Sequence, residues 1–317
     1  MFSPTARLVT ASTLALLLAA CGGSGSSGGG GTPSGNAATA STSGTWSGSA
    51  APANLTLVAG TQAFVRTVDN RQVLYVIPDP APTGPAPLMI MLDYLGGNPT
   101  FMANLIYAAE HAAKGEQFAF PAQSGLSWND GFVFNGDPTS DIDFLDDVIA
   151  DAVTMPVDPK RISMTGYSEG GFMANLYACT KPGMISGYGM VGASQLTTTS
   201  CETGTPLKMI DISGTDDQEA PYDGFGSVEP ALTALNYWDG VDGCSGAIVD
   251  SDLPTVVDDG TSVVTHQVSG CNAILYEIVG GGHDWPGAEV TASTTLLGKT
   301  SGNLDATEVQ WEFLSGT

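Results

Sequence analysis

Residues 161 to 171 read Arg161-Ile-Ser-Met-Thr-Gly-Tyr-Ser-Glu-Gly-Gly171, which places the pattern G-x-S-x-G around Ser168. The apolar residues before this pattern predict a strand at 161–165, and the residues after it predict a helix at 172–179. A serine in a sharp turn between a strand and a helix has strained backbone angles, and the flanking glycines leave room for close chain contacts. Because such a turn lifts the hydroxyl off the sheet, we predict that Ser168 is a nucleophile.

A serine nucleophile needs a base, and the base needs an acid that orients it. The chain has three histidines. His111 precedes the serine in a predicted helix and is expected at the surface, whereas His266 lies in an alternating stretch and is expected in a strand. His283 follows an apolar strand through three glycines, on the kind of loop where catalytic residues of parallel sheets gather, and is the predicted base. Asp216 and Asp217 follow another apolar strand, and spacing alone does not choose between them as the acid.

The body of the chain alternates between expected strands and helices. The strands are expected at 63–67, 72–77, 87–92, 161–165, 207–213 and 273–279, and the helices at 100–114, 141–152, 172–179 and 306–314. A continuous apolar run such as 87–92 is typical of a strand buried in a parallel sheet. We therefore predict an α/β fold with a mostly parallel central sheet flanked by helices.

Four cysteines lie in this body. An even number in an exported chain favours two disulfides, and we expect the pairs Cys179–Cys201 and Cys244–Cys271, which close short loops. The sequence has no C-x-x-C motif and few histidines, so we expect no metal and no cofactor. The acids between 141 and 151 lack the glycine and the terminal glutamate of a calcium loop, and we interpret them as a helix cap and a solvated face.

The first twenty residues have the features of an export signal. Arg7 precedes an apolar run at 8–20 that is too short to span a bilayer. The run ends in Leu18-Ala-Ala-Cys21, which resembles the lipobox of bacterial lipoproteins, where cleavage precedes the cysteine and the cysteine carries the lipid. We therefore expect residues 1–20 to be a lipoprotein signal peptide with Cys21 as the lipid attachment site. The alternative is an ordinary secretory signal.

The segment after the signal is expected to be a tether. Residues 21–50 are rich in glycine and serine and offer almost nothing to bury, so the catalytic domain is expected at 51–317. The predicted location is the cell envelope, lipid-anchored at the outer membrane or the cell surface, or the secreted fraction.

The chain is strongly acidic, with 33 Asp and Glu residues against 9 Lys and Arg residues and a net charge of −24. Such a charge repels phosphate backbones and excludes nucleic acid as a partner. Anionic membrane surfaces are poor partners for the same reason, so contact with a membrane is expected only through the lipid. We expect a monomer.

Several segments resemble the polyhydroxybutyrate depolymerase/feruloyl esterase family of α/β-hydrolases, which includes LpqC-like esterases. They are the segment 157–171 around Ser168, Trp128-Asn-Asp-Gly131, Gly214-Thr-Asp-Asp-Gln-Glu-Ala-Pro-Tyr222, Gly281-Gly-His-Asp-Trp-Pro-Gly287 and the closing segment 305–313. They occur in the family's order from about residue 60 to the end. The resemblance implies an α/β-hydrolase fold, assigns the acid to Asp217 and supports His283 as the base.

One loop departs from the family pattern. After the strand that ends at Leu92, the family has His-Gly, whereas this chain has Asp93-Tyr-Leu-Gly-Gly97. The loop should supply one oxyanion donor, and the N–H of Glu169 the other. By position, the first donor is expected to be the N–H of Leu95, with Tyr94 as the alternative.

Aromatic residues near the motifs are candidates for substrate contacts. Tyr94 is a candidate to stack on a bound substrate. Trp128, Trp285, Phe132 and Tyr222 are expected to line the cleft, and the alternative for them is a buried structural role.

The expected function is a lipid-anchored serine esterase that works through an acyl-enzyme. The family covers short-chain polyhydroxyalkanoates, feruloyl esters and acetylated xylan. A tethered, exported, acidic enzyme suits an insoluble polymer, so polyesters or oligoesters are expected first and feruloyl or acetyl xylan esters second. The alternative of another class is a non-catalytic binding lipoprotein on a hydrolase fold, which the altered oxyanion loop keeps open.

Overall fold

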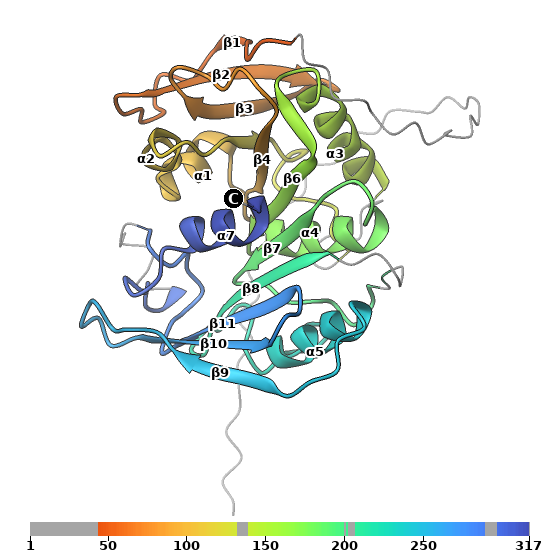
Figure 1. Ribbon diagram of the computed structural model, residues 1–317, viewed down its shortest axis with the longest axis vertical. Helices are drawn as coiled ribbons and strands as arrows, with labels where there is room; N and C mark the ends of the chain where they lie inside the picture. Colours follow the sequence, from red (N-terminus) through yellow and green to blue (C-terminus); the bar gives the residue numbers. More distant parts are fainter. Residues whose placement is uncertain (1–43, 132–138, 200, 202–206, 289–296, 317) are drawn as a thin grey trace, which may run out of the picture. The chain divides into compact units, whose positions relative to one another are not determined.

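The computed structural model describes residues 44–131, 139–199, 201, 207–288 and 297–316, all within one compact unit that spans 38–317. Within these ranges, eleven strands form one sheet in the order β1-β2-β3-β5-β4-β6-β7-β8-β11-β10-β9 (Figure 1). The signal, Cys21 and most of the expected tether lie outside the described residues. No helix in the described part of the chain is long and apolar enough to cross a membrane.

The strands are β1 (Ser49–Ala50), β2 (Thr61–Val68), β3 (Arg71–Pro78), β4 (Ala86–Leu92), β5 (Phe118–Pro121), β6 (Val157–Tyr167), β7 (Gly187–Val191), β8 (Lys208–Gly214), β9 (Ile248–Asp252), β10 (Ser262–Val268) and β11 (Ala273–Val279). The helices are α1 (Pro99–Leu105), α2 (Ala108–Ala113), α3 (Thr139–Ala152), α4 (Glu169–Thr180), α5 (Ala231–Val241) and α7 (Ala306–Ser315). From β5 to β11 the neighbouring strands are parallel, and the outer pairs are antiparallel. The predicted mostly parallel central sheet is confirmed.

The helices cover both faces of this sheet. Along β4, Leu88, Ile90 and Leu92 pack with the buried residues of α3, α4 and α5. Met89 and Met91 pack on the opposite face with those of α1, α2 and α7. Figure 1 shows the two groups of helices on opposite sides of the strands. Because side chains alternate along a strand, a continuous apolar run serves both cores, and every residue of β4 is buried.

The expected helix at 100–114 is two helices. Its apolar spacing continues through Tyr107, but that residue has a φ of 53°, in the left-handed region, and it separates α1 from α2. The bend brings His111 inward, so the expectation of a surface histidine is wrong. Its side chain is buried between Glu116 and Asp305, which lie 3.2 and 3.3 Å from its two ring nitrogens.

Asp141 also differs from expectation, because it is not part of a solvated face. Its carboxylate is fully buried and lies 2.5 Å from the guanidinium of Arg71. It also accepts hydrogen bonds from the backbone and side-chain nitrogens of Asn129. A buried carboxylate is tolerated here because a cation and two N–H donors replace its water.

The packed part of the chain begins before residue 51. Ser49 and Ala50 form β1 and pair with β2. The indole N–H of Trp46 donates to the carbonyl of Pro82 at 3.0 Å. Residues on the N-terminal side of the boundary that composition places at residue 50 therefore pack against the domain, because a tryptophan in a glycine-rich stretch provides a surface to bury.

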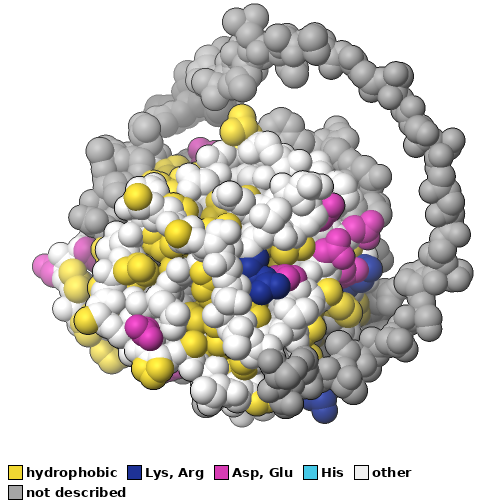
Figure 2. Space-filling model, turned by 90° about the horizontal axis from the view of Figure 1, so that it is seen from above, with side chains coloured by type: hydrophobic (Ala, Val, Ile, Leu, Met, Phe, Trp, Pro, Cys, Tyr) yellow, Lys and Arg dark blue, Asp and Glu magenta, His cyan; other side chains and the backbone are white. Residues whose placement is uncertain are grey.

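Both expected disulfides, Cys179–Cys201 and Cys244–Cys271, are present. Several basic side chains are paired with acids at 2.6–2.9 Å, namely Arg66 with Asp151, Lys181 with Asp146, Lys114 with Glu308 and Arg161 with Asp158. Figure 2 views the molecule from the side that is uppermost in Figure 1 and shows Lys and Arg side chains close to Asp and Glu within a largely uncharged surface. The surplus of acids leaves the protein with a negative field.

Candidate active site

The turn between β6 and α4 has the geometry predicted for G-x-S-x-G. Ser168 connects the two elements with φ 54° and ψ −120°, a conformation that few non-glycine residues adopt. A Cβ atom at Gly166 would lie 2.2 Å from the backbone of Gly170. A Cβ atom at Gly170 would lie 2.4 Å from the carbonyl oxygen of Leu92, at the end of β4. Only glycine at both positions permits these contacts, so the two glycines and the strained serine form one tight unit.

Three side chains from separate loops form a continuous hydrogen-bonded chain. The hydroxyl of Ser168 lies 2.8 Å from Nε2 of His283, and Nδ1 of His283 lies 2.7 Å from Oδ2 of Asp217. Asp217 follows β8, and His283 follows β11, which is the neighbouring parallel strand. The carboxyl ends of these strands therefore bring the predicted nucleophile, base and acid together.

The structure distinguishes Asp217 from Asp216. The second oxygen of Asp217 accepts the backbone N–H groups of Glu219 and Ala220, both at 2.8 Å, so the carboxylate is fixed and buried. Asp216 is exposed, and its backbone N–H donates to the carbonyl of Gly281. The geometry therefore favours Asp217, which the resemblance assigned, as the acid.

The backbone around His283 fixes the position of the imidazole. The hydroxyl of Tyr167, the residue before the serine, donates to the carbonyl of His283 at 2.8 Å. A Cβ atom at Gly192, which has a φ of +59°, would lie 3.1 Å from Nδ1 of His283. Tyr167 was not among the predicted site residues. Its position as the x of G-x-S-x-G was the only signal in the sequence.

Two backbone N–H groups are available as oxyanion donors. In the described part of the chain, neither the N–H of Glu169 nor that of Leu95 donates to a protein group. Glu169 opens α4, where the first turn of a helix leaves N–H groups without a partner. Leu95 and Tyr94 border the same cavity as Ser168. The geometry suits the predicted pair Glu169 and Leu95, and the assignment of Leu95 over Tyr94 stays a prediction.

Gln123 and Trp128 donate hydrogen bonds to the expected oxyanion loop at 93–97. The amide of Gln123 donates to Oδ1 of Asp93 at 3.0 Å and to the carbonyl of Tyr94 at 2.9 Å. The indole N–H of Trp128 lies 2.9 Å from the carbonyl oxygen of Asp93 and 3.2 Å from its Oδ1. Asp93, the first residue of this loop, is thus an acceptor for two buried donors.

The same segment also contacts the other side of the expected oxyanion site. The backbone N–H of Trp128 donates to the carboxylate of Glu169 at 3.2 Å, and the hydroxyl of Ser127 donates to it at 2.5 Å. Trp128 is fully buried, so the expectation that it lines the cleft is wrong. It instead joins the loop that carries Leu95 to the residue that follows the nucleophile.

Both carboxyl groups beside this site have raised pKa values. Burial raises the pKa of Asp93 to about 7, although hydrogen bonds from Trp128 and Gln123 oppose the shift. Burial also raises the pKa of Glu169 to about 7, against the hydrogen bond from Ser127. Each group therefore retains its proton to near-neutral pH, which reduces the negative charge beside the expected oxyanion.

A cavity of about 310 Å³ opens beside the serine, and most of its walls are apolar. Its lining residues are Tyr94, Leu95, Phe101, Leu105, Tyr167, Ser168, Glu219, His283, Asp284 and Leu297. Of the aromatic residues expected in the cleft, only Tyr94 is among them, and Phe132 lies outside the described residues. Apolar residues of α1 form walls that the sequence did not identify.

Trp285 and Tyr222 also differ from the expectation that they line the cleft, because neither is among the lining residues of the cavity. Trp285 is buried, and its indole N–H donates to the hydroxyl of Thr307 at 3.2 Å. The hydroxyl of Tyr222 donates to the carboxylate of Glu277 at 3.2 Å, and its ring packs against the core. The polar atom of each side chain is therefore engaged by another protein group, although Tyr222 is only partly buried.

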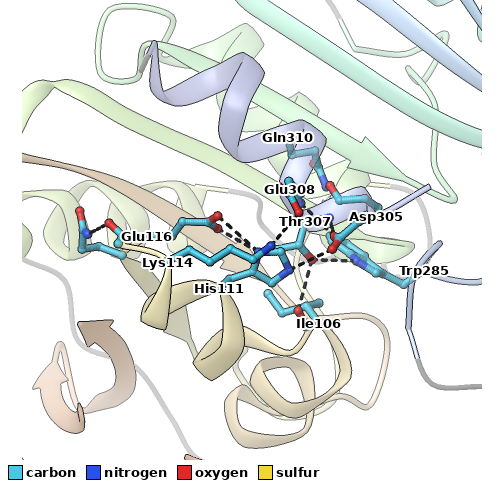
Figure 3. Close-up of polar contacts among 12 residues, drawn as sticks. Ile106, His111, Lys114, Glu116, Trp285, Asp305, Thr307, Glu308 and Gln310 are labelled. Carbon is cyan, nitrogen blue, oxygen red and sulfur yellow. Dashed lines mark hydrogen bonds and ion pairs between the residues drawn. The ribbon is translucent and has the colours of Figure 1, made fainter. Parts of the chain in front are cut away.

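Figure 3 shows how the loop that carries the base is joined to α1 and α7. Thr307 accepts the hydrogen bond from Trp285, two residues after the base, and donates to the carbonyl of Ile106 at 3.3 Å. Beside it, His111 connects α2 to Asp305 at the start of α7. Burial opposes the charge on His111, but the hydrogen bonds that its ring N–H groups donate to Asp305 and Glu116 outweigh it and raise the pKa of His111 to about 9. These contacts hold two walls of the cavity together.

Two groups of three candidate metal ligands occur among the described residues, away from the triad. Asp239 lies near Cys244 and Cys271, but these cysteines are joined in a disulfide and offer no thiolate. His111, Asp305 and Glu308 form the other group, and the ammonium of Lys114 lies 2.7 Å from Glu308. Neither group contributes to the cavity beside Ser168.

Comparisons with known proteins support the fold. No protein family model matches the chain. A protein of Nocardia uniformis subsp. tsuyamanensis with the name "Putative esterase NocK" is 28% identical in an alignment 203 positions long that covers 57% of this chain and 58% of that protein. This chain therefore spans less than two thirds of that relative.

Among solved structures, an acetyl xylan esterase from Aspergillus awamori superposes with a TM-score of 0.53 at 16% identity, over 70% of this chain and 94% of that one. An S-formylglutathione hydrolase from Agrobacterium tumefaciens gives a TM-score of 0.47 at 12% identity, over 82% and 97%. The chain has the α/β-hydrolase fold.

Proposed function

We propose that this protein is a serine esterase, and that it hydrolyses uncharged carboxylic esters of the polyester or oligoester type. One observation carries the proposal: Ser168, His283 and Asp217 form an uninterrupted hydrogen-bonded chain, and the first two of them line an apolar cavity. The relative whose name includes the word esterase supports the same reaction class.

The proposed reaction is acyl transfer in two steps. His283 takes the proton of Ser168 as the hydroxyl oxygen attacks the ester carbonyl, and Asp217 stabilises the imidazolium. The oxyanion accepts the N–H groups of Glu169 and Leu95. The protonated His283 then gives its proton to the leaving alcohol, which leaves an acyl-enzyme. Water, deprotonated by the same histidine, releases the acid and restores the serine.

The cavity supports an ester with an apolar body. Leucine, phenylalanine and tyrosine side chains form its walls, and its described lining includes no Lys or Arg. An uncharged polyester segment with short alkyl branches would bury these branches there at a gain of roughly 25 cal/mol per Å².

We also propose that the protein works outside the cytoplasm, attached through a lipid on Cys21. The apolar run that ends at this cysteine supports the anchor. The two disulfides fit an oxidising compartment. Mass spectrometry of the protein purified from membranes of an expressing bacterium tests the anchor, because a diacylated Cys21 at the N-terminus is expected.

The test of the reaction is hydrolysis of 4-nitrophenyl acetate and butyrate. Ser168→Ala is expected to lower kcat by ~10⁴-fold or more, and Asp217→Asn to lower it by a similar factor. Asp216→Asn is the matched control, because it removes an exposed carboxylate next in sequence, and it is expected to retain full activity. Equal losses in the two aspartate variants would contradict the assigned acid. A folded wild type without activity would favour the binding-lipoprotein alternative.

A further inference from the structure

We propose that the cavity selects esters whose acyl chain is uncharged along its length, and that it rejects acyl chains that end in a carboxylate. The inference rests on the proposed function and adds a substrate class to it. It implies that esters of hydroxy acids are accepted, whereas half-esters of dicarboxylic acids are not.

The first support is the character of the cavity walls. Leu95 and Phe101 are 43% and 46% exposed, although large apolar side chains are usually buried. Leu105 and Leu297 lie beside them and are partly buried. We place the acyl chain of the ester against these walls, because Leu95 both borders the cavity and belongs to the loop that is expected to hold the carbonyl oxygen.

The second support is the sign of the charges that face the cavity. Glu219 is exposed at its edge, and Asp284 lies in its wall. Asp284 is already engaged, since it accepts the N–H of Trp285 at 2.8 Å and the hydroxyl of Thr300. The buried Asp217 lies directly behind the imidazole of His283. A carboxylate that entered would meet these acids.

The third support is the lack of compensation for a buried anion. In the described lining, His283 is the one side chain that can carry a positive charge, and its two nitrogens face the serine and Asp217. A substrate carboxylate would lose its water without gaining a cation or a dedicated N–H group. The net charge of −24 adds a repulsive field at longer range.

The consequence concerns which polyesters are degraded completely. In an oligomer of hydroxy acids, the acyl fragment ends in a hydroxyl group, which is neutral. In an oligomer of diacids and diols, the acyl fragment acquires a carboxylate once its far end has been cut. The enzyme is therefore expected to degrade hydroxy-acid oligoesters to short products and to accumulate half-esters from diacid polyesters.

The test compares three 4-nitrophenyl esters with six-carbon acyl chains, namely the hexanoate, the 6-hydroxyhexanoate and the adipate half-ester, at pH 7.5. We expect kcat/KM for the adipate to be ~30-fold or more below the hexanoate, since an anion enters an uncompensated apolar site. The hydroxyhexanoate should remain within ~5-fold of the hexanoate, which separates charge from polarity. Ser168→Ala provides the blank.

Two variants of the full protein test the source of the selection. Glu219→Gln is expected to raise the adipate rate relative to the hexanoate rate by ~3-fold to 10-fold, with a smaller effect at 0.5 M salt, where surface charges are screened. Asp216→Asn removes an equal charge outside the cavity and should leave the ratio unchanged.

The outcomes separate this inference from the proposed function. Equal kcat/KM for hexanoate and adipate, both abolished in Ser168→Ala, would overturn the selection and leave the esterase intact. Failure of a folded protein to cleave any of the three esters would overturn the esterase and the selection together.

Discussion

Replacement of Trp128 by phenylalanine tests whether the oxyanion loop is held in place by a single indole. The substitution keeps an aromatic ring at a fully buried position and removes the N–H that faces Asp93. We expect a loss of both stability and kcat, because this N–H is a contact between the core and the loop that carries Leu95.

The magnitude follows from the contacts of the indole. Its N–H lies 2.9 Å from the backbone carbonyl of Asp93 and 3.2 Å from Oδ1. Oδ1 keeps the amide of Gln123 as a donor, whereas in the described part of the chain the carbonyl loses its donor. An orphaned buried acceptor costs ~1–3 kcal/mol of unfolding free energy. For kcat, the loss of a whole oxyanion donor, ~10²–10³-fold, is the upper bound, and we expect ~10-fold to 10²-fold for a displaced loop.

The assay measures urea unfolding and 4-nitrophenyl butyrate hydrolysis together. The matched control is Trp238→Phe in α5, where a buried indole of the same size lies 5.0 Å, ring to ring, from Tyr188 and does not contact the 93–97 loop. It should lose stability through lost volume but keep kcat. A kcat in Trp128→Phe equal to that of the Trp238 variant would refute the idea that the indole positions the loop.

Three further substitutions have defined outcomes. Gly170→Ala should abolish most activity and lower Tm, because its Cβ would lie 2.4 Å from the carbonyl oxygen of Leu92. The control Gly183→Ala, which has open space around its Cβ, should change neither activity nor Tm. An active Gly170→Ala variant would contradict the tight packing of the turn around Ser168. The pKa of His111 is raised to about 9, so the stability that its ion pairs contribute is complete below about pH 6.5 and is lost as pH rises through 9. In urea unfolding experiments across this pH range, His111→Gln should lose up to ~3 kcal/mol less unfolding free energy than the wild type. Parallel curves of unfolding free energy against pH would refute the ion pairs. The pKa of Asp93 is raised from 3.8 to about 7, so the folded state holds a proton that the unfolded chain releases. The unfolding free energy therefore falls as pH rises from about 4 to 7, and Asp93→Asn should remove up to ~4 kcal/mol of that fall. An unchanged slope of unfolding free energy against pH would show that Asp93 ionises normally.

Strong local patterns in the sequence predicted much of the fold. The apolar run at 87–92 is β4, the expected helix at 141–152 is α3, and the G-x-S-x-G segment is the turn between β6 and α4. In each case, the order of apolar and polar residues in the segment matches the burial of these residues in the fold, so the local sequence was enough to predict the element.

Other elements could not be predicted because their signals are weak or lie elsewhere in the chain. The strand β7 reads Gly-Tyr-Gly-Met-Val, and its glycines suggest a loop. One of them, Gly189, is required because a Cβ would collide with Gln310, a residue 121 positions later in the chain. No local pattern contains that information.

In the candidate site, too, some residues could be predicted from local sequence and others could not. The three residues that the structure brings into contact were predicted because motif and chain order restrict them, and the choice of Asp217 needed the family resemblance. The walls of the cavity were missed because Phe101 and Leu105, at helical spacing, look like residues that face a core. Trp128 and Trp285 were assigned to the cleft because their loops carry motifs, whereas their indole groups are used inside the protein.

The eleven-stranded sheet has two edges, and an edge strand is where a second copy of a protein can add a strand of its own. One edge ends in β1, which is only two residues long, and the other in β9, which pairs only with β10 within the described residues. Asp250 and Asp252 lie on this exposed strand, and their charges discourage a second copy from adding its own strand. A second copy added along β9 would bring its own acids against these two, so association through this edge is expected to be disfavoured.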